Sequence, residues 1–138
     1  MTIFYADTSA LVKLVRDEPE SGALRSYLSD ADLVCCDLAL TELPRAIQRA
    51  AALSPDLLPV ASLLSRAEEL LDSLALIPLD RDLLVAAGSL DEPALRALDA
   101  IHVAAASLVA PLDGFVSYDE RQAAAARLAG LRTFAPGV

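Results

Sequence analysis

Hydrophobic residues recur along the chain with two different spacings. Five short, mostly apolar stretches are typical of buried strands, and they cover residues 2–6, 33–36, 74–80, 114–119 and 131–135. Between them, apolar residues return every three or four positions, which is the spacing of an amphipathic helix. Strands that alternate with helices indicate an α/β fold with a parallel sheet of roughly five strands and helices on both faces.

The segments between the strands predict the helices. The first helix is expected to begin at Thr8, and Pro59 is expected near the start of a long helix. Gly130 is expected to close the last helix. No repeat or linker divides the chain, so residues 1–138 are expected to form a single domain. The other helices are predicted within residues 19–31, 38–53, 55–73, 81–90, 90–110 and 119–130.

Composition narrows the function classes. The chain is 55% hydrophobic, yet no apolar run approaches the roughly 18 residues of a membrane span. It shows no signal peptide, so we expect a cytoplasmic protein. A net charge of -9 leaves no basic stripe of the kind that typical nucleic-acid-binding proteins carry. The adjacent Cys35 and Cys36 should point to opposite faces of their strand, so we expect two reduced, partly buried thiols rather than a disulfide or shared metal ligands.

Acidic residues mark the carboxyl edge of the predicted sheet, where parallel α/β folds place their sites. Asp7 and Asp119 end the first and fourth strands. Asp37 and Asp80 follow the second and third strands. Each of these acids could simply cap the helix that follows it, because Asp is a favoured N-cap residue. We expect Asp37 and Asp80 to be caps.

Two further acids lie on helices that should reach the same edge. Glu42 could be an exposed first-turn acid that the helix dipole favours. Asp99 lies among apolar residues and is expected to be buried in mid-helix, where an unpaired carboxylate is costly. With Asp7 and Asp119, they are predicted to form a cage for a hard cation, Mg²⁺ or Mn²⁺. Zinc fits poorly, and the single histidine, His102, is expected to be a packed or surface imidazole.

Four segments resemble, in order and spacing, the PIN domains of the VapC toxin type. They are DTSALVKL, TELPRA, LRALDAIHVAAA and SYDERQAAAARLAGL, and they span essentially the whole chain. The resemblance implies a three-layer α/β/α sandwich. It also implies a metal-dependent endoribonuclease, the toxin of a type II toxin–antitoxin system, which uses Mg²⁺ or Mn²⁺ held by four acids.

The resemblance assigns roles to individual residues. Asp7 and Asp99 would be the main metal ligands, and Glu42 would bind through water or a second ion. Asp119 would position the attacking water or complete the coordination. Pro44 departs from the usual small hydroxyl residue, as a first-turn proline can. Thr8 and Ser9 are expected to support the metal site, and Arg45 and Arg121 to help bind RNA. Arg45 could instead be bound by an antitoxin.

The resemblance also implies partners. Besides the RNA substrate, it predicts a VapB-type antitoxin whose tail covers the active-site groove, and a homodimer. The apolar stripe within residues 57–71 could line such a groove or interface, or it could simply pack on the sheet.

Other classes of protein fit less well. A phospho-acceptor receiver domain needs a lysine after its last strand, and the only lysine, Lys13, lies in the first predicted helix. An aspartyl phosphatase would need a second Asp where Ser9 stands, and Ser9 is not in a serine-hydrolase elbow. The remaining alternative is a catalytically silent PIN-like binding module or scaffold.

Overall fold

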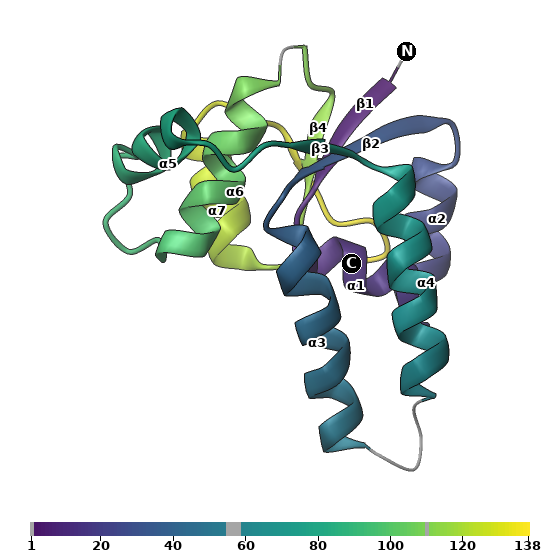
Figure 1. Cartoon of the computed structure of the whole chain (residues 1–138). Helices are drawn as coiled ribbons and strands as arrows, with labels where there is room; N and C mark the ends of the chain where they lie inside the picture. Colours follow the sequence, from purple (N-terminus) through teal and green to yellow (C-terminus); the bar gives the residue numbers. More distant parts are fainter. Residues whose placement is uncertain (1, 55–58, 110) are drawn as a thin grey trace.

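Five parallel strands form one sheet at the centre of the molecule (Figure 1). The computed structural model describes residues 2–54, 59–109 and 111–138. The sheet has the order β3-β2-β1-β4-β5. Its strands are β1 (Thr2–Ala6), β2 (Ala31–Cys36), β3 (Ala75–Ile77), β4 (Gly114–Val116) and β5 (Thr133–Phe134).

The first strand lies in the middle of the sheet. Residues 4–6 of β1 are buried, as expected for a strand covered on both faces. β1 pairs with β2 on one side and with β4 on the other, with Tyr5 opposite Val34 and Phe115. The chain order therefore reverses beside β1, between β1 and β4. In open α/β sheets such a switch point is the usual place of a site, outside the carboxyl ends of the strands.

Seven helices in the described residues cover the sheet in two groups. α1 contacts α2, α3 and α4, and α3 contacts α4, whereas α6 contacts α5 and α7. Figure 1 shows the sheet between the two groups, which confirms the three-layer α/β/α sandwich. The helices are α1 (Thr8–Val15), α2 (Ser21–Leu28), α3 (Ala39–Leu53), α4 (Val60–Ser73), α5 (Arg81–Gly88), α6 (Ala97–Leu108) and α7 (Glu120–Leu128).

Helices α3 and α4 pack on each other and project beyond the sheet as an arm (Figure 1). Their buried residues include Leu43 and Ile47 of α3 and Leu63 and Ala67 of α4. The described residues of the predicted apolar stripe are half-buried and pack against the core; they are Val60, Leu64, Leu70 and Leu71. Leu57, the first residue of that stripe, lies outside the described residues.

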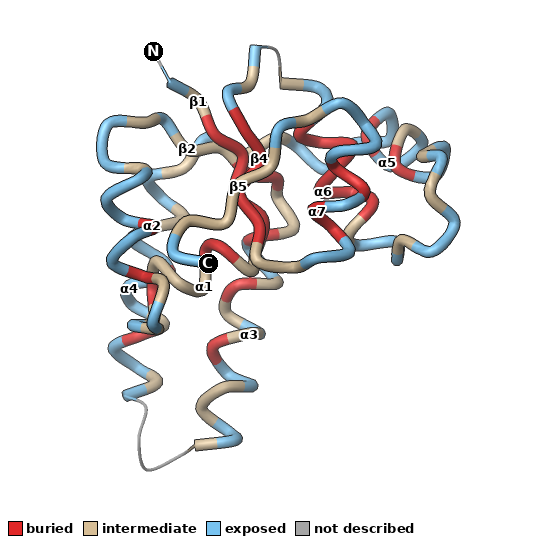
Figure 2. Tube along the Cα trace, turned by 180° about the vertical axis from the view of Figure 1, so that it is seen from behind, coloured by how far each residue is buried: buried red, intermediate tan, exposed pale blue. Residues whose placement is uncertain are grey.

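The core is built around aromatic rings of the central strands and small residues of α6. Figure 2 shows that buried residues concentrate in β1, β4 and α6. The rings of Tyr5 and Phe115 stack with centroids 5.3 Å apart. Most of the α6 face is alanine, with Ala105 and Ala106 fully buried. Small side chains let this helix approach the sheet closely. The packed helix holds His102 beside Tyr5 of β1, close to the edge where that strand ends.

The positions of two residues within their helices differ from expectation. Asp99 is the third residue of α6, so it lies in the first turn rather than in mid-helix, and it is only half-buried. Pro44 lies in the second turn of α3, whereas the sequence analysis placed it in the first turn. At Pro44 the helix lacks one backbone donor. Among the described residues, none of the helices is long and apolar enough to cross a membrane.

Candidate active site

Asp7 ends β1 and begins α1 at the switch point of the sheet. Its side chain accepts a hydrogen bond from the backbone N–H of Ala10 at 3.1 Å, so it is the N-cap of α1. The same carboxylate accepts hydrogen bonds from the hydroxyls of Ser9 at 2.6 Å and Ser117 at 2.5 Å. Asp7 is completely buried. Burial raises its pKa, and the two hydroxyls oppose that rise.

The two serines tie the loop after β4 to Asp7. Ser9 accepts a hydrogen bond from the backbone N–H of Tyr118 at 2.9 Å. Ser117 accepts one from the backbone N–H of Asp119 at 3.1 Å. The sequence analysis identified Ser9 but missed Ser117. Its position directly after a strand, at the same edge as Asp7, was the available signal.

Glu42 is held by two side chains from other elements. Its Oε1 accepts a hydrogen bond from the Thr8 hydroxyl at 2.7 Å and lies 2.6 Å from Nε2 of His102. Burial alone would raise the pKa of Glu42, but the hydrogen bonds from His102 and Thr8 lower it overall. Glu42 is therefore an ionised carboxylate with a fixed orientation.

His102 is a buried link between the site and the core. Its Nδ1 lies 2.8 Å from the Tyr5 hydroxyl, on the side of the ring opposite Glu42. Burial alone would lower the pKa of His102, but contacts with Cys36 and Glu42 raise it to about 10. The expectation of a packed imidazole is confirmed. The residue also orients an acid of the site, which the sequence analysis did not predict.

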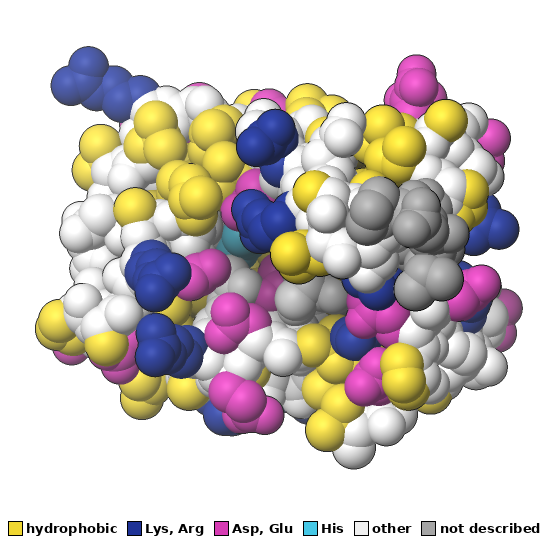
Figure 3. Space-filling model, turned by 90° about the horizontal axis from the view of Figure 1, so that it is seen from below, with side chains coloured by type: hydrophobic (Ala, Val, Ile, Leu, Met, Phe, Trp, Pro, Cys, Tyr) yellow, Lys and Arg dark blue, Asp and Glu magenta, His cyan; other side chains and the backbone are white. Residues whose placement is uncertain are grey.

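Asp99 and Asp119 line a pocket of about 360 Å³ together with Arg96 and Arg121. Asp119 also caps α7, because its Oδ1 accepts the backbone N–H of Arg121 at 2.9 Å. Burial raises the pKa of Asp99, and the negative charges of Asp119 and Glu42 raise it further. Figure 3 shows acidic and basic side chains gathered around a recess on the face seen from below.

The structure separates these acids from the remaining candidates. Asp80 caps α5 by accepting the backbone N–H of Leu83 at 2.9 Å, as expected. Asp37 does not cap α3; it accepts the backbone N–H of Leu79 at 3.2 Å instead. Arg45 is exposed on α3, three residues after Glu42. The sequence analysis missed Arg96, which lines the pocket. Arg96 directly precedes α6, and the sequence alone did not reveal where that helix begins.

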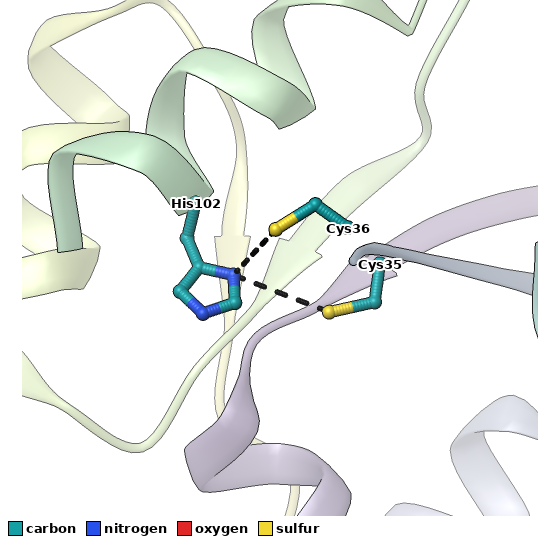
Figure 4. A group of neighbouring side chains, drawn as sticks. All are labelled: Cys35, Cys36 and His102. Atoms are coloured by element: carbon teal, nitrogen blue, oxygen red, sulfur yellow. Dashed lines mark hydrogen bonds between the residues drawn. The ribbon is translucent and has the colours of Figure 1, made fainter. Parts of the chain in front are cut away.

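The cysteines also differ from expectation. Both are free, as predicted, and they are fully buried rather than partly buried. However, the sulfurs of Cys36 and Cys35 lie 3.8 Å and 4.0 Å from the same nitrogen, Nδ1 of His102 (Figure 4). Cys36 is the last residue of β2, where the chain turns toward α3, so strict alternation of faces ends there.

The donor chemistry of the four acids fits a hard divalent cation. Oδ2 of Asp7 accepts one hydrogen bond, from Ser117, so it keeps a lone pair for a further partner. Burial raises the pKa of both Asp7 and Asp99, and at Asp99 the negative charges of Asp119 and Glu42 add to that rise. A bound cation would stabilise the charged form of both carboxylates. In the described residues, however, no three of these carboxylates converge as closely as Cys35, Cys36 and His102 do. Water or small side-chain shifts would bridge the acids to an ion.

Comparison with known proteins places this chain in a family. The PIN-domain family profile matches residues 4–128. Ribonuclease VapC35 of Mycobacterium tuberculosis is 43% identical to the chain over 142 residues, which cover 98% of each protein. Ribonuclease VapC47 of the same organism is 36% identical over 141 residues, again with 98% of each covered.

Solved structures share the fold at low sequence identity. The crystal structure of VapC20 from Mycobacterium tuberculosis, described as a sarcin-ricin loop cleaving toxin, has a TM-score of 0.71 and 16% identity. The match covers 96% of this chain and 99% of that one. The crystal structure of VapBC2 from Rickettsia felis, bound to a DNA fragment from their promoter, has a TM-score of 0.70 and 13% sequence identity. That match covers 98% of this chain and 99% of the other. The chain belongs to the PIN-domain family and is of the VapC type.

Proposed function

We propose that this protein is the toxin of a type II toxin–antitoxin system and that it hydrolyses phosphodiester bonds within RNA. The observation that carries the proposal is the pocket that Asp99 and Asp119 line at the sheet edge, in a chain whose whole length matches proteins named ribonucleases. The contacts of Asp7 with Ser117 and of Glu42 with His102 support adding these two acids to the proposed site. Phosphodiester hydrolysis needs an activated water and stabilisation of a negatively charged transition state, which such a site can support.

Mg²⁺ or Mn²⁺ is the proposed cofactor, with Asp7 and Asp99 as its main ligands. Bound there, the ion would lower the pKa of water and neutralise charge on the phosphate. Asp7 is suited to a fixed ligand because Ser9, Ser117 and Ala10 hold its carboxylate. Asp99 is suited to an exchangeable one, because it lines an open pocket.

Glu42 and Asp119 complete the proposed site. Thr8 and His102 hold Glu42 in its ionised form, so it can accept hydrogen bonds from metal-bound water. Asp119 faces Asp99 across the pocket while its Oδ1 caps α7. Its other oxygen is the one that can orient the attacking water.

The RNA would approach past exposed arginines. Arg121 lines the pocket beside Asp119, and Arg45 lies exposed near Glu42 on α3. Their positive charge would reduce the repulsion between the acids of the site and the phosphates of the RNA backbone. A VapB-type antitoxin is the proposed protein partner, and a homodimer is the proposed assembly. Support comes from the VapC names of the relatives and from the VapBC2 structure, whose VapC-type fold this chain shares.

The test uses purified, antitoxin-free protein and a panel of RNAs. Cleavage is measured with Mg²⁺ or Mn²⁺, with EDTA, and in the variants Asp99→Asn and Asp119→Asn. We expect metal-dependent cleavage that Asp99→Asn abolishes while the variant stays folded. Cleavage that persists in EDTA and in both variants would contradict the proposal. If metal also failed to bind, the silent binding module would replace it.

A further inference from the structure

A second cluster of potential metal ligands lies beside the acidic site. The proposed nuclease uses only Nε2 of its histidine, which contacts Glu42, and leaves the two thiols and Nδ1 without a role. The cluster consists of Sγ of Cys35, Sγ of Cys36 and Nδ1 of His102 (Figure 4). These three atoms lie within 4.8 Å of one another. Both thiols are 0% exposed and His102 is 2% exposed. They come from β2 and α6, so the folded sheet and helix bring them together.

The spacing of the three atoms suits a single small ion. Zinc bonds of about 2.3 Å to sulfur and about 2.0 Å to nitrogen hold such ligands about 3.5–3.7 Å apart. The observed sulfur–nitrogen separations are 3.8 Å for Cys36 and 4.0 Å for Cys35. Closing the two sulfur–nitrogen separations around an ion needs shifts of roughly a few tenths of an ångström. The two sulfurs, which lie within 4.8 Å of each other, would need to approach by at most about 1 Å. Figure 4 shows both sulfurs directed at the same nitrogen of the ring.

The other side of the imidazole supplies an independent indication. Histidines that bind metals usually give their second ring N–H to a carboxylate, which fixes the ring and increases its basicity. Nε2 of His102 makes this contact with Glu42 at 2.6 Å. The Glu42 carboxylate keeps a proton on Nε2, so Nδ1 is the nitrogen left to bind an ion.

We propose that Cys35, Cys36 and His102 form a binding site for a thiophilic cation, with Zn²⁺ as the best fit. Binding would release two protons from the cluster and leave two thiolates and a neutral imidazole on the ion. The two positive charges of the zinc ion and the two negative charges of the thiolates then cancel, and a buried site tolerates a neutral group better than a charged one. The Tyr5 hydroxyl, now 2.8 Å from Nδ1, would exchange that hydrogen bond for the fourth position on the ion.

The two sites would select different ions. Thiolate and imidazole ligands favour zinc and other soft cations, whereas the carboxylates of the pocket favour Mg²⁺ or Mn²⁺. His102 touches both sites, through Nδ1 and Nε2. The buried ion would therefore brace the residue that orients Glu42.

The test is spectroscopic and begins with the wild-type full chain, purified under reducing conditions. Zn²⁺ or Co²⁺ is supplied both in the growth medium, so that a buried site can fill as the chain folds, and by titration of metal-free protein. We expect one tightly held ion per chain, thiolate-to-cobalt charge-transfer absorption, and two sulfur neighbours at about 2.3 Å by zinc X-ray absorption. The chain has two cysteines in all, so any thiolate signal belongs to this cluster.

Variants separate this cluster from the acidic site. Cys36→Ala should lose the charge-transfer band and the tightly held zinc, whereas Asp99→Asn should keep both. A zinc shell of oxygen and nitrogen alone, or no zinc held after either route of loading, would overturn the proposal. The wild-type absorption spectrum decides the question even where Cys36→Ala fails to fold. The absorption spectrum does not depend on nuclease activity. Failure of the proposed zinc site is therefore distinguishable from failure of the proposed ribonuclease function.

Discussion

Asp7 carries a structural and a chemical role on one carboxylate. As N-cap it satisfies a backbone donor at the start of α1, and as a buried acid it keeps a negative charge out of water. The structure compensates with the hydroxyls of Ser9 and Ser117, yet the pKa of Asp7 still lies above its ordinary value. The fold thus carries a destabilising charge at the position where a cation is proposed to bind.

The raised pKa of Asp7 predicts how stability depends on pH in the metal-free protein. Above the unfolded value of 3.8, the folded state binds more protons than the unfolded state, so its stability falls as pH rises through the folded pKa. Asp7→Asn removes this fall. In EDTA, the melting temperature of the variant relative to wild type should therefore increase from about pH 4 to pH 7. A difference that stays constant with pH would contradict the account.

Thr8 predicts a loss of activity from a single hydroxyl. Its hydrogen bond to Glu42 is charge-assisted and 2.7 Å long. Thr8→Val removes it with little change in shape, and such a bond contributes about 1.5–3 kcal/mol. We expect kcat to fall by roughly tenfold or more.

Thr8→Ser is the matched control, because it keeps the hydroxyl and should keep most of the activity. Steady-state kinetics on a cleavable RNA measure both variants. Equal losses in Thr8→Val and Thr8→Ser would mean that packing, rather than the hydrogen bond to Glu42, matters at this position.

At the scale of elements, the sequence predicts most of the fold because strand and helix periods alternate cleanly. All five predicted strands appear, and Pro59 directly precedes α4. The first turn of α6 was misplaced, because its N-cap is Arg96, whose side chain makes no capping hydrogen bond and so leaves no signal. Asp99 was consequently described as more buried than it is.

The site was only partly predictable for a related reason. Strand ends identified Asp7 and Asp119, since the topology alone brings such positions to one edge. The bonds from His102 to Glu42 and from Ser117 to Asp7 depend on how α6 and the loop after β4 dock. Sequence periodicity carries no information on such contacts between distant segments.

Gly114 at the start of β4 gives a prediction about packing between strands. A methyl group at this position would overlap the ring of Phe134 and press against Phe4 at 3.0 Å. Gly114→Ala should lower the free energy of unfolding by about 1–3 kcal/mol, because rings on both sides must move. Chemical denaturation measures the change.

Gly88 at the end of α5 is the control, because nothing lies within 4 Å of an added methyl group there. Gly88→Ala should raise the free energy of unfolding by about 0.5–1 kcal/mol, through helix propensity and a less flexible unfolded chain. A Gly114→Ala variant as stable as wild type would show that the sheet has more room than described.

At the scale of the whole molecule, the negative net charge of the protein opposes the binding of RNA, which is also negatively charged. The net charge is -9, so long-range attraction of RNA is unfavourable and binding depends on local charges. The pocket offers Arg96 and Arg121 next to its acids. A bound divalent cation would add positive charge to the same pocket and so favour the binding of a phosphate there.

Arg121 therefore predicts a binding effect. Arg121→Ala should raise KM for RNA by roughly twofold to fivefold, the size expected for one exposed ion pair, with kcat nearly unchanged. Arg132→Ala is the control, because Arg132 is exposed directly before β5, at the opposite edge of the sheet. An equal effect of both variants would mean that RNA responds to total charge instead of to the pocket.

The most direct test of the account is cleavage of RNA by the purified, antitoxin-free wild type, measured beside Asp7→Asn and Asp99→Asn with Mg²⁺ or Mn²⁺ and with EDTA. The account predicts cleavage by the wild type only when metal is present, and none by either variant although circular dichroism shows both folded. Cleavage that continues in EDTA, or at wild-type rate in both variants, would contradict the claim that these acids hold the metal of a ribonuclease.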